Sequence, residues 1–226
     1  MRRTFFAVVG LCIFSATMLP GCLRAQTTPL WPDTFLTRVE ALALVETLNA
    51  TLLAARSATF TLDQWCADHK LSSETKIRAQ LIRGVEKPLT PEQRQRLEID
   101  GHEPVKFRHV ELKCGDHTLS EADNWYVPSR LTAEMNTVLD TTDTPFGRAV
   151  AALKPFRRTF AVDILWKPLA DGWETRSLPA DHPQQALTMP PQLFQHRALV
   201  ITPELKPISE VAETYTSENL AFALPR

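Results

Sequence analysis

Apolar residues recur at helical spacing in the first part of the chain. Over residues 36–56 they return every three or four positions, which predicts one long amphipathic helix. The apolar positions are Leu36, Val39, Leu42, Val45, Leu48 and Leu52. A second, shorter helix is predicted over residues 62–69, and residues 26–34 are expected to be a linker ahead of the first helix.

Beyond Ser73 the period changes to two, which predicts strands. Residues 75–84 alternate as a half-exposed strand, and residues 104–128 read as a hairpin that turns near Gly115. Short helices are expected after caps at Thr90 and Thr132.

The C-terminal part continues the same pattern. A strand over residues 156–169 is expected to pair with the segment after the turn at residues 170–174, and residues 194–215 form a closing hairpin. The Pro-rich stretch 178–191 reads as an irregular connection. Helices early in the chain, followed by antiparallel strands with short helices between them, predict an α+β fold. We expect an antiparallel sheet of about six strands flanked by helices, in a single domain over residues 35–226.

The N-terminus has the pattern of a secretory signal peptide over residues 1–25. Arg2 and Arg3 precede an apolar run from residue 5 to residue 19, and small residues follow. The sequence LPGC resembles a bacterial lipobox with Cys22 as the lipidated residue, although Pro20 is unusual there. Cleavage after Ala25 is the alternative. The first route predicts a periplasmic protein tethered to the membrane through Cys22, and the second a free periplasmic protein.

Composition and charge narrow the kind of partner. The chain has 226 residues, is 44% hydrophobic and 23% charged, and carries a net charge of -1 from 25 basic and 26 acidic residues. That balance argues against nucleic acid as a partner, so a small molecule or another protein is expected. Export would leave Cys66 and Cys114 in an oxidising compartment, where a disulfide is expected; two buried thiols are the alternative.

Two strands carry charged residues among apolar ones. Arg108 shares a face with Val110 and Leu112, so it needs a carboxylate or a ligand unless it lies at the sheet edge. On the last strand either Glu210 or Glu213 is buried, and parity alone leaves both open. A buried Glu213 would need a cation such as Arg108, or would be protonated, and either state suits acid chemistry.

Other features suggest neither a metal nor a cofactor. His69 has no cluster of Cys, His or Asp at metal-ligand spacing around it, and we expect it to be a partly buried structural residue. The turn TPFGRAV, which runs into a helix, can direct backbone N–H groups into a cavity.

Four segments carry a family resemblance. FRHVELKCGD has the form Arg, any residue, Val or Ile, any residue, Leu; NWYVP ends a hairpin strand in Val-Pro; DTPFGRAV contains a Pro-Phe-Gly-Arg turn; and KPISEVAETY leads from Lys-Pro to a glutamate followed two residues later by an aromatic residue. In this order, from residue 107 to residue 215, they resemble the chorismate lyase family and the related UTRA ligand-binding domains of transcriptional regulators. That resemblance implies a six-stranded antiparallel sheet with the ligand enclosed between sheet and helices.

The resemblance also implies roles for particular residues. It assigns carboxylate binding to Arg108, backbone contacts to Phe146 and Gly147, and an acidic role to Glu213 with Tyr215 as the following aromatic residue. Asn124 stands where the family usually has an arginine and is carried over as a ligand contact. With Glu213 selected, Glu210 is expected in solvent and Glu218 beyond the strand.

Three functions remain open on this basis. The first is an exported chorismate lyase-like protein that encloses a small aromatic or carboxylate-bearing ligand and eliminates pyruvate from chorismate to give 4-hydroxybenzoate, with Arg108 binding the carboxylate and Glu213 as general acid. The second is a non-catalytic periplasmic binding or envelope-associated protein on the same fold. The third is a scaffold in which Arg108 and Glu213 form one internal ion pair.

Overall fold

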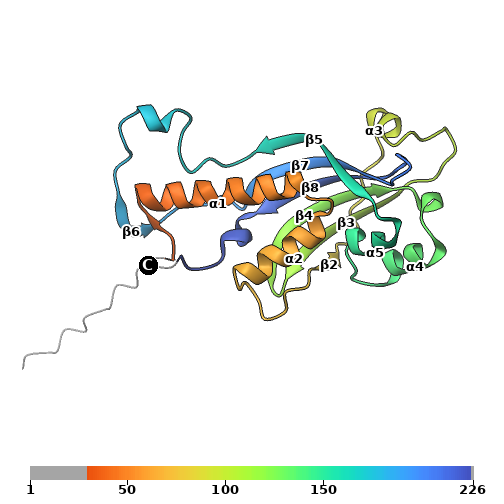
Figure 1. Ribbon diagram of the computed structural model, residues 1–226, viewed down its shortest axis with the longest axis horizontal. Coiled ribbons are helices and arrows are strands. Elements are labelled where there is room, and N and C mark those ends of the chain that lie inside the picture. The colour runs from red at the N-terminus through yellow and green to blue at the C-terminus, as the bar shows by residue number, and fades with distance from the viewer. Residues whose placement is uncertain (1–29, 225–226) are drawn as a thin grey trace, which may run out of the picture.

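The computed structural model describes residues 30–224, and a large antiparallel sheet with helices packed on it dominates the fold (Figure 1). Six strands lie in the order β2-β3-β4-β8-β7-β5, and each neighbouring pair is antiparallel. Their bounds are β2 Arg78–Leu81, β3 Lys106–Cys114, β4 His117–Tyr126, β5 Phe156–Ile164, β7 Gln192–Ile201 and β8 Pro207–Thr216. The predicted α+β class with about six strands is confirmed.

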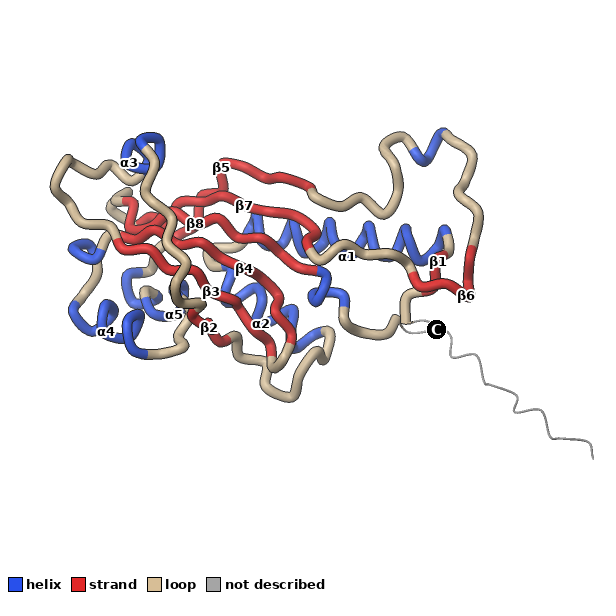
Figure 2. Tube along the Cα trace, turned by 180° about the vertical axis from the view of Figure 1, so that it is seen from behind, coloured by secondary structure: helices blue, strands red, loops and turns tan. Residues whose placement is uncertain are grey.

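Most helices cover one face of this sheet. α1 (Phe35–Ala54), α2 (Ala58–Asp68), α4 (Ala133–Thr141) and α5 (Phe146–Ala149) lie in front of the strands in Figure 1, and the strands lie in front of α1 and α2 in Figure 2. The short α3 (Pro91–Arg96) belongs to the opposite face, where the adjoining Leu97 packs with Trp125 and Leu199. The described part of the chain also contains four 3-10 turns, η1 Pro128–Arg130, η2 Ala151–Leu153, η3 Trp173–Thr175 and η4 Ser217–Leu220.

The helix starts follow local capping chemistry. α1 begins after Thr34, whose hydroxyl accepts a hydrogen bond from the Thr37 N–H, and its bounds lie within two residues of the prediction. Thr90 and Gln93 form a capping box at the start of α3. α2 begins at Ala58, earlier than predicted, because its first turn is buried and adds Ala58 and Thr59 to the interior.

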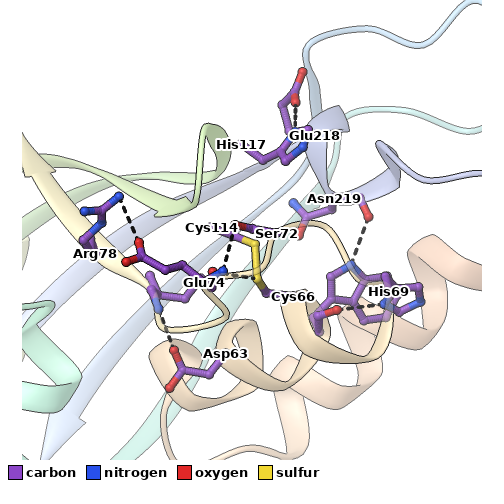
Figure 3. Close-up of a disulfide and its surroundings, with 12 residues drawn as sticks. Asp63, Cys66, His69, Ser72, Glu74, Arg78, Cys114, His117, Glu218 and Asn219 are labelled. Atoms are coloured by element: carbon purple, nitrogen blue, oxygen red, sulfur yellow. Dashed lines mark hydrogen bonds and ion pairs between the residues drawn. A yellow bond between two sulfur atoms is a disulfide. The ribbon is translucent and has the colours of Figure 1, made fainter.

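The main hydrophobic core lies between the sheet and the pair α1 and α2. Leu48 and Leu52 from α1 and Leu62 from α2 pack in one cluster with Val110 and Leu112 of β3. A disulfide between Cys66 of α2 and Cys114 of β3 ties this helix to the sheet, with 6.1 Å between the two Cα atoms (Figure 3). The expected pairing of these two cysteines is confirmed.

Strand pairing differs from the prediction at the C-terminal half. β5 pairs with β7, so its predicted pairing with the segment after residues 170–174 is wrong. That segment carries Pro179 and few apolar residues, whereas β7 supplies an extended apolar run. Within the stretch expected to be irregular, β6 (His182–Ala186) pairs with β1 (Pro32–Asp33) in a separate two-stranded sheet.

The end of the expected linker is ordered, because Trp31 is buried and its Nε1 donates to the Leu220 carbonyl at 2.9 Å. The predicted signal peptide, with Cys22, lies outside the described residues. Among residues 30–224, no helix has the length and apolarity required to cross a membrane.

Candidate functional site

A cavity of about 400 Å³ lies between the sheet and its helical cover. Its floor comes from the central strands, and its roof from the N-terminal turn of α2, from α5 and from the segment that leads into β5. Most of its lining is apolar, with Val110 and Val211 from the sheet and Phe60 and Phe146 from the helices. The polar groups in this apolar setting decide what the cavity can bind.

Arg108 is the most unusual of these polar groups. The strand alternation places it on the helix-covered face, and only 6% of the residue is exposed. Within residues 30–224, its Nε and Nη2 atoms have no hydrogen-bond partner, and no carboxylate lies within ion-pair distance. Burial lowers the pKa of this guanidinium from its ordinary value. Asp140 acts on this cation only from beyond ion-pair distance and is itself paired with Lys106. A buried cation without a contacting carboxylate is costly, so the site favours the binding of an anion.

Glu213 faces the same cavity but already has a cation of its own. Arg157 of β5 donates from Nη2 to the Glu213 Oε2 atom at 2.7 Å, and the Tyr215 hydroxyl donates to the same oxygen at 3.2 Å. Burial alone would lower the pKa of Arg157, but the charge and hydrogen bond of Glu213, together with Tyr215, outweigh burial and raise the pKa. The hypothesis of an Arg108–Glu213 ion pair is therefore wrong, because the partner of Glu213 is Arg157.

The remaining residues assigned by resemblance divide into two groups. Asn124, Phe146 and Gly147 line the cavity. Asn124 is opposite Arg108 on the neighbouring strand, and its Oδ1 accepts a hydrogen bond from the Ser209 hydroxyl. Tyr215 does not line the cavity; it is fully buried behind Glu213, and burial together with the Glu213 charge raises its pKa well above the ordinary value.

Gly147 allows the roof of the cavity to close. A Cβ atom at this position would lie 2.7 Å from Ser57 Oγ and 2.9 Å from Thr59 Oγ1. These are the residues at the start of α2, so the missing side chain lets α5 pack against that helix end. Ser57 itself faces the cavity, and within the described residues its buried hydroxyl has no hydrogen-bond partner.

The charges around the cavity are unequal. Four basic side chains line it and one carboxylate opposes them: Arg56, Arg108, Lys154 and Arg157 against Glu213. The N-terminal turn of α2 adds the positive end of a helix dipole at the same wall. The cavity therefore favours an anionic group.

Glu210 and Glu218 are placed differently from each other. Glu210 was expected in solvent, but only 3% of it is exposed, and Arg96 binds both of its carboxylate oxygens at 2.8 Å on the opposite face of the sheet. The prediction was wrong because α3 covers that face at this point. Glu218 lies beyond the strand, as predicted, in η4, where His117 contacts it at 2.6 Å (Figure 3).

Two buried side chains near the site were missed by the sequence analysis. Arg157 was missed because its strand was paired incorrectly, and the only signal was its position beside Arg158 in an otherwise alternating strand. His196 of β7 lies opposite Glu213 and is fully buried, with Nε2 at 2.8 Å from Asn49 Oδ1. Burial, helped by the Arg157 charge, lowers the pKa of His196 to about 4.

His69 packs as a structural residue. It is half-buried, its Nδ1 lies 2.9 Å from the Trp65 carbonyl oxygen, and its ring lies between Trp65 and Phe222. Across residues 30–224, no group of three or more His, Cys, Asp or Glu side chains is arranged to hold a metal ion.

One sequence relative covers almost the whole chain. A Sinorhizobium fredii (strain NBRC 101917 / NGR234) protein, described as uncharacterized protein y4mC, is 47% identical over 227 residues, covering 98% of this chain and 95% of that protein. No protein-family model matches the chain.

The similar solved structures have much lower sequence identity to this chain than the Sinorhizobium fredii protein has. PhnF from Mycobacterium smegmatis aligns at 15% identity and a TM-score of 0.48, covering 77% of this chain and 70% of its own. Its effector domain gives 15% identity and a TM-score of 0.45, with 72% and 89% covered. A GntR-family transcriptional regulator from Enterococcus faecalis V583 gives 10% identity and a TM-score of 0.38, with 67% and 100% covered.

Proposed function

The chain belongs to the same family as the y4mC protein of Sinorhizobium fredii. We propose that the chain has a binding function, in which the cavity beside Arg108 holds a small molecule that carries one carboxylate. The observation that carries this proposal is the buried Arg108 guanidinium, whose Nε and Nη2 atoms have no hydrogen-bond partner among the described residues and which has no carboxylate within ion-pair distance. A carboxylate is the group that a guanidinium binds through two parallel hydrogen bonds. Bound there, it would accept one hydrogen bond from Nε and one from Nη2, the two nitrogen atoms of Arg108 that the described residues leave unpaired.

The rest of the cavity limits the ligand further. A volume of about 400 Å³ is in the range of small-molecule sites, and the apolar walls favour a ring or hydrocarbon body. The second buried arginine, Arg157, is already neutralised by Glu213. Asn124, an amide rather than a cation, lies beside Arg108. Among residues 30–224, Arg108 is the one buried cation of the cavity lining without a carboxylate at ion-pair distance, which supports one carboxylate on the ligand rather than two.

The binding proposal is tested with matched aromatic ligands. Thermal unfolding and calorimetric titration with benzoate and 4-hydroxybenzoate are expected to show stabilisation and saturable binding, because a ligand that binds only the folded state stabilises it by mass action. Benzamide, which has the same ring without the charge, is expected to bind much more weakly. The Arg108→Met variant is expected to lose the preference for the acids, and equal binding of acid and amide by the native protein would contradict the proposal.

Elimination of pyruvate from chorismate is the second candidate. It is favoured by the position of Glu213, whose carboxylate faces the same cavity as Arg108. Against it, Arg157 holds this carboxylate in an ion pair, an arrangement that suits ligand binding better than proton donation. Incubating the protein with chorismate and measuring 4-hydroxybenzoate separates the two candidates. Product formation above the uncatalysed rate, lost in Glu213→Gln, would establish lyase activity.

We place this binding in the periplasm. The basis is the signal-like sequence before residue 26, with which the disulfide is consistent. Fractionation of bacteria that express the full chain tests the location. A mass that includes a diacylglycerol on Cys22, lost in Cys22→Ala, would identify a membrane-tethered form, whereas cleavage after Ala25 would identify a free one.

A further inference from the structure

A second hollow adjoins the ligand cavity. It is a groove of about 530 Å³ between α1 and α2, and we call it the α1–α2 groove. Its walls include Leu44, Thr47 and Thr51 of α1 and Thr61 and Trp65 of α2. Three residues, Arg56, Ser57 and Phe60, line both this groove and the cavity. The two hollows are therefore neighbours across the start of α2.

Most polar side chains of the groove are hydrogen-bonded within the protein, and the exception among the described residues is Ser57, at the border with the cavity. The hydroxyls of Thr47, Thr51 and Thr61 each donate to the backbone carbonyl four residues earlier in the chain, at 2.7, 2.7 and 3.2 Å. Their methyl groups and the carbon surfaces of Leu44 and Trp65 remain for contact with a ligand.

Three further polar side chains of the groove are also hydrogen-bonded within the protein. The Trp65 indole donates to the Asn219 carbonyl at 2.9 Å, Gln64 donates to Asp68 at 2.6 Å, and Arg56 donates to the Lys154 carbonyl at 3.0 Å. A ligand in the groove is therefore offered mainly apolar surface, whereas the cavity alone contains the unpaired Nε and Nη2 atoms of Arg108, and the unpaired Ser57 hydroxyl lies where the two hollows meet. This contrast predicts a ligand with one polar end and one apolar end.

We propose that the ligand is a single-headed amphiphile of the fatty-acid type, whose carboxylate lies at Arg108 and whose hydrocarbon tail passes Arg56 and Phe60 into the α1–α2 groove. This inference rests on the proposed carboxylate-binding function and adds the class of the ligand. The tail is the occupant because the groove adjoins the cavity, with which it shares Arg56, Ser57 and Phe60. Phe60, which lines both hollows and is 47% exposed, gains a hydrocarbon contact that the free protein lacks.

The test is a chain-length series measured by calorimetric titration. Straight-chain carboxylates from hexanoate to tetradecanoate are titrated against the full mature protein, with dodecanol as the uncharged control. Each methylene that enters an apolar surface is expected to tighten binding about fourfold, so the dissociation constant should keep falling beyond octanoate. Dodecanol is expected to bind far more weakly than dodecanoate, because it lacks the charge that Arg108 binds.

Matched variants locate the tail. Thr51→Trp places a large ring in the groove, and Ala50→Trp places the same ring on the adjacent exposed position, which lines neither hollow. Dodecanoate affinity is expected to fall to that of octanoate in Thr51→Trp and to stay at the native value in Ala50→Trp, while benzoate binding stays unchanged in both.

The outcomes separate this inference from the function on which it rests. If short acids bind through Arg108 but affinity does not rise with chain length, the amphiphile inference is overturned and carboxylate binding stands. A length dependence that survives equally in both tryptophan variants places the tail elsewhere and also overturns the inference. If no carboxylate of any length binds, both proposals fail.

Discussion

Arg157 and Glu213 form an ion pair between two strands of the sheet, with 2.7 Å between Nη2 and Oε2 and only 3% and 9% of the two side chains exposed. Removing one member leaves the other charge buried without a partner, which typically costs about 3–5 kcal/mol. We expect Arg157→Met to lower the free energy of unfolding by about this amount in urea denaturation.

A double-mutant cycle checks the cause of that loss. Glu213→Leu combined with Arg157→Met removes both charges, so the double variant is expected to be more stable than the sum of the two single losses predicts. Strictly additive losses would show that the pair does not stabilise the fold as a unit.

Arg108 provides the matched comparison, since it is also buried but has no protein partner among the described residues. Arg108→Met removes an uncompensated charge and replaces it with a side chain suited to the apolar cavity. The unfolding free energy is expected to stay within about 1 kcal/mol of the native value or to rise, while carboxylate binding is lost. A loss as large as that of Arg157→Met would mean that Arg108 is a structural residue.

The difference between these two arginines shows what the sequence could predict. The inward direction of Arg108 followed from a local rule, the period of two along β3, and the structure agrees with it. The partner of Glu213 depended on strand order, because β7 lies between β5 and β8 in the sheet. Periodicity contains no information on strand order. The sequence analysis therefore named Arg108 as the possible ion-pair partner of Glu213, whereas the partner is Arg157.

Glu210 shows a second limit of the pattern. Alternation assumes that one face of a strand is wet, and on that assumption either Glu210 or Glu213 had to lie in solvent. Both are buried, because α3 covers the second face near Glu210 and its Arg96 supplies the positive charge that pairs with Glu210. The caps at Thr90 and Thr132 were predicted because capping depends only on neighbouring residues.

Gly147 is expected to resist substitution for steric reasons. In Gly147→Ala the new methyl group would meet Ser57 Oγ and Thr59 Oγ1 at less than 3.0 Å, so α5 must move away from α2. We expect a loss of about 1–3 kcal/mol in urea denaturation and weaker benzoate binding, because the cavity roof shifts. Gly101→Ala is the control, since a Cβ atom there meets nothing within 4 Å. Equal effects of the two substitutions would contradict the packing argument.

His196 is expected to make stability depend on pH. Its folded-state pKa is about 4 and its ordinary value is 6.5, so between these values the unfolded chain binds a proton that the folded protein does not. The free energy of unfolding should therefore fall as the pH is lowered through this window, by about 3 kcal/mol in total.

The measurement is urea denaturation at about pH 7 and about pH 4.5, compared with His196→Gln. Glutamine retains an N–H donor for Asn49 Oδ1 but does not titrate, so the variant is expected to lose less stability on acidification than the native protein does. Equal pH dependence of the two proteins would show that His196 is not the group responsible.

The Cys66–Cys114 disulfide joins residues 48 apart in the sequence and crosses from the helix layer to the sheet. Closing a loop of this length restricts the unfolded chain, which on the chain-entropy model stabilises the folded state by about 4 kcal/mol, and typical measured values are about 2–4 kcal/mol. We expect the double variant Cys66→Ala and Cys114→Ala to lose stability in this range in urea denaturation. The native protein with a reductant should approach the variant, and the variant itself should not respond to the reductant. If the reduced and oxidised native proteins unfold at the same urea concentration, the disulfide does not stabilise this domain.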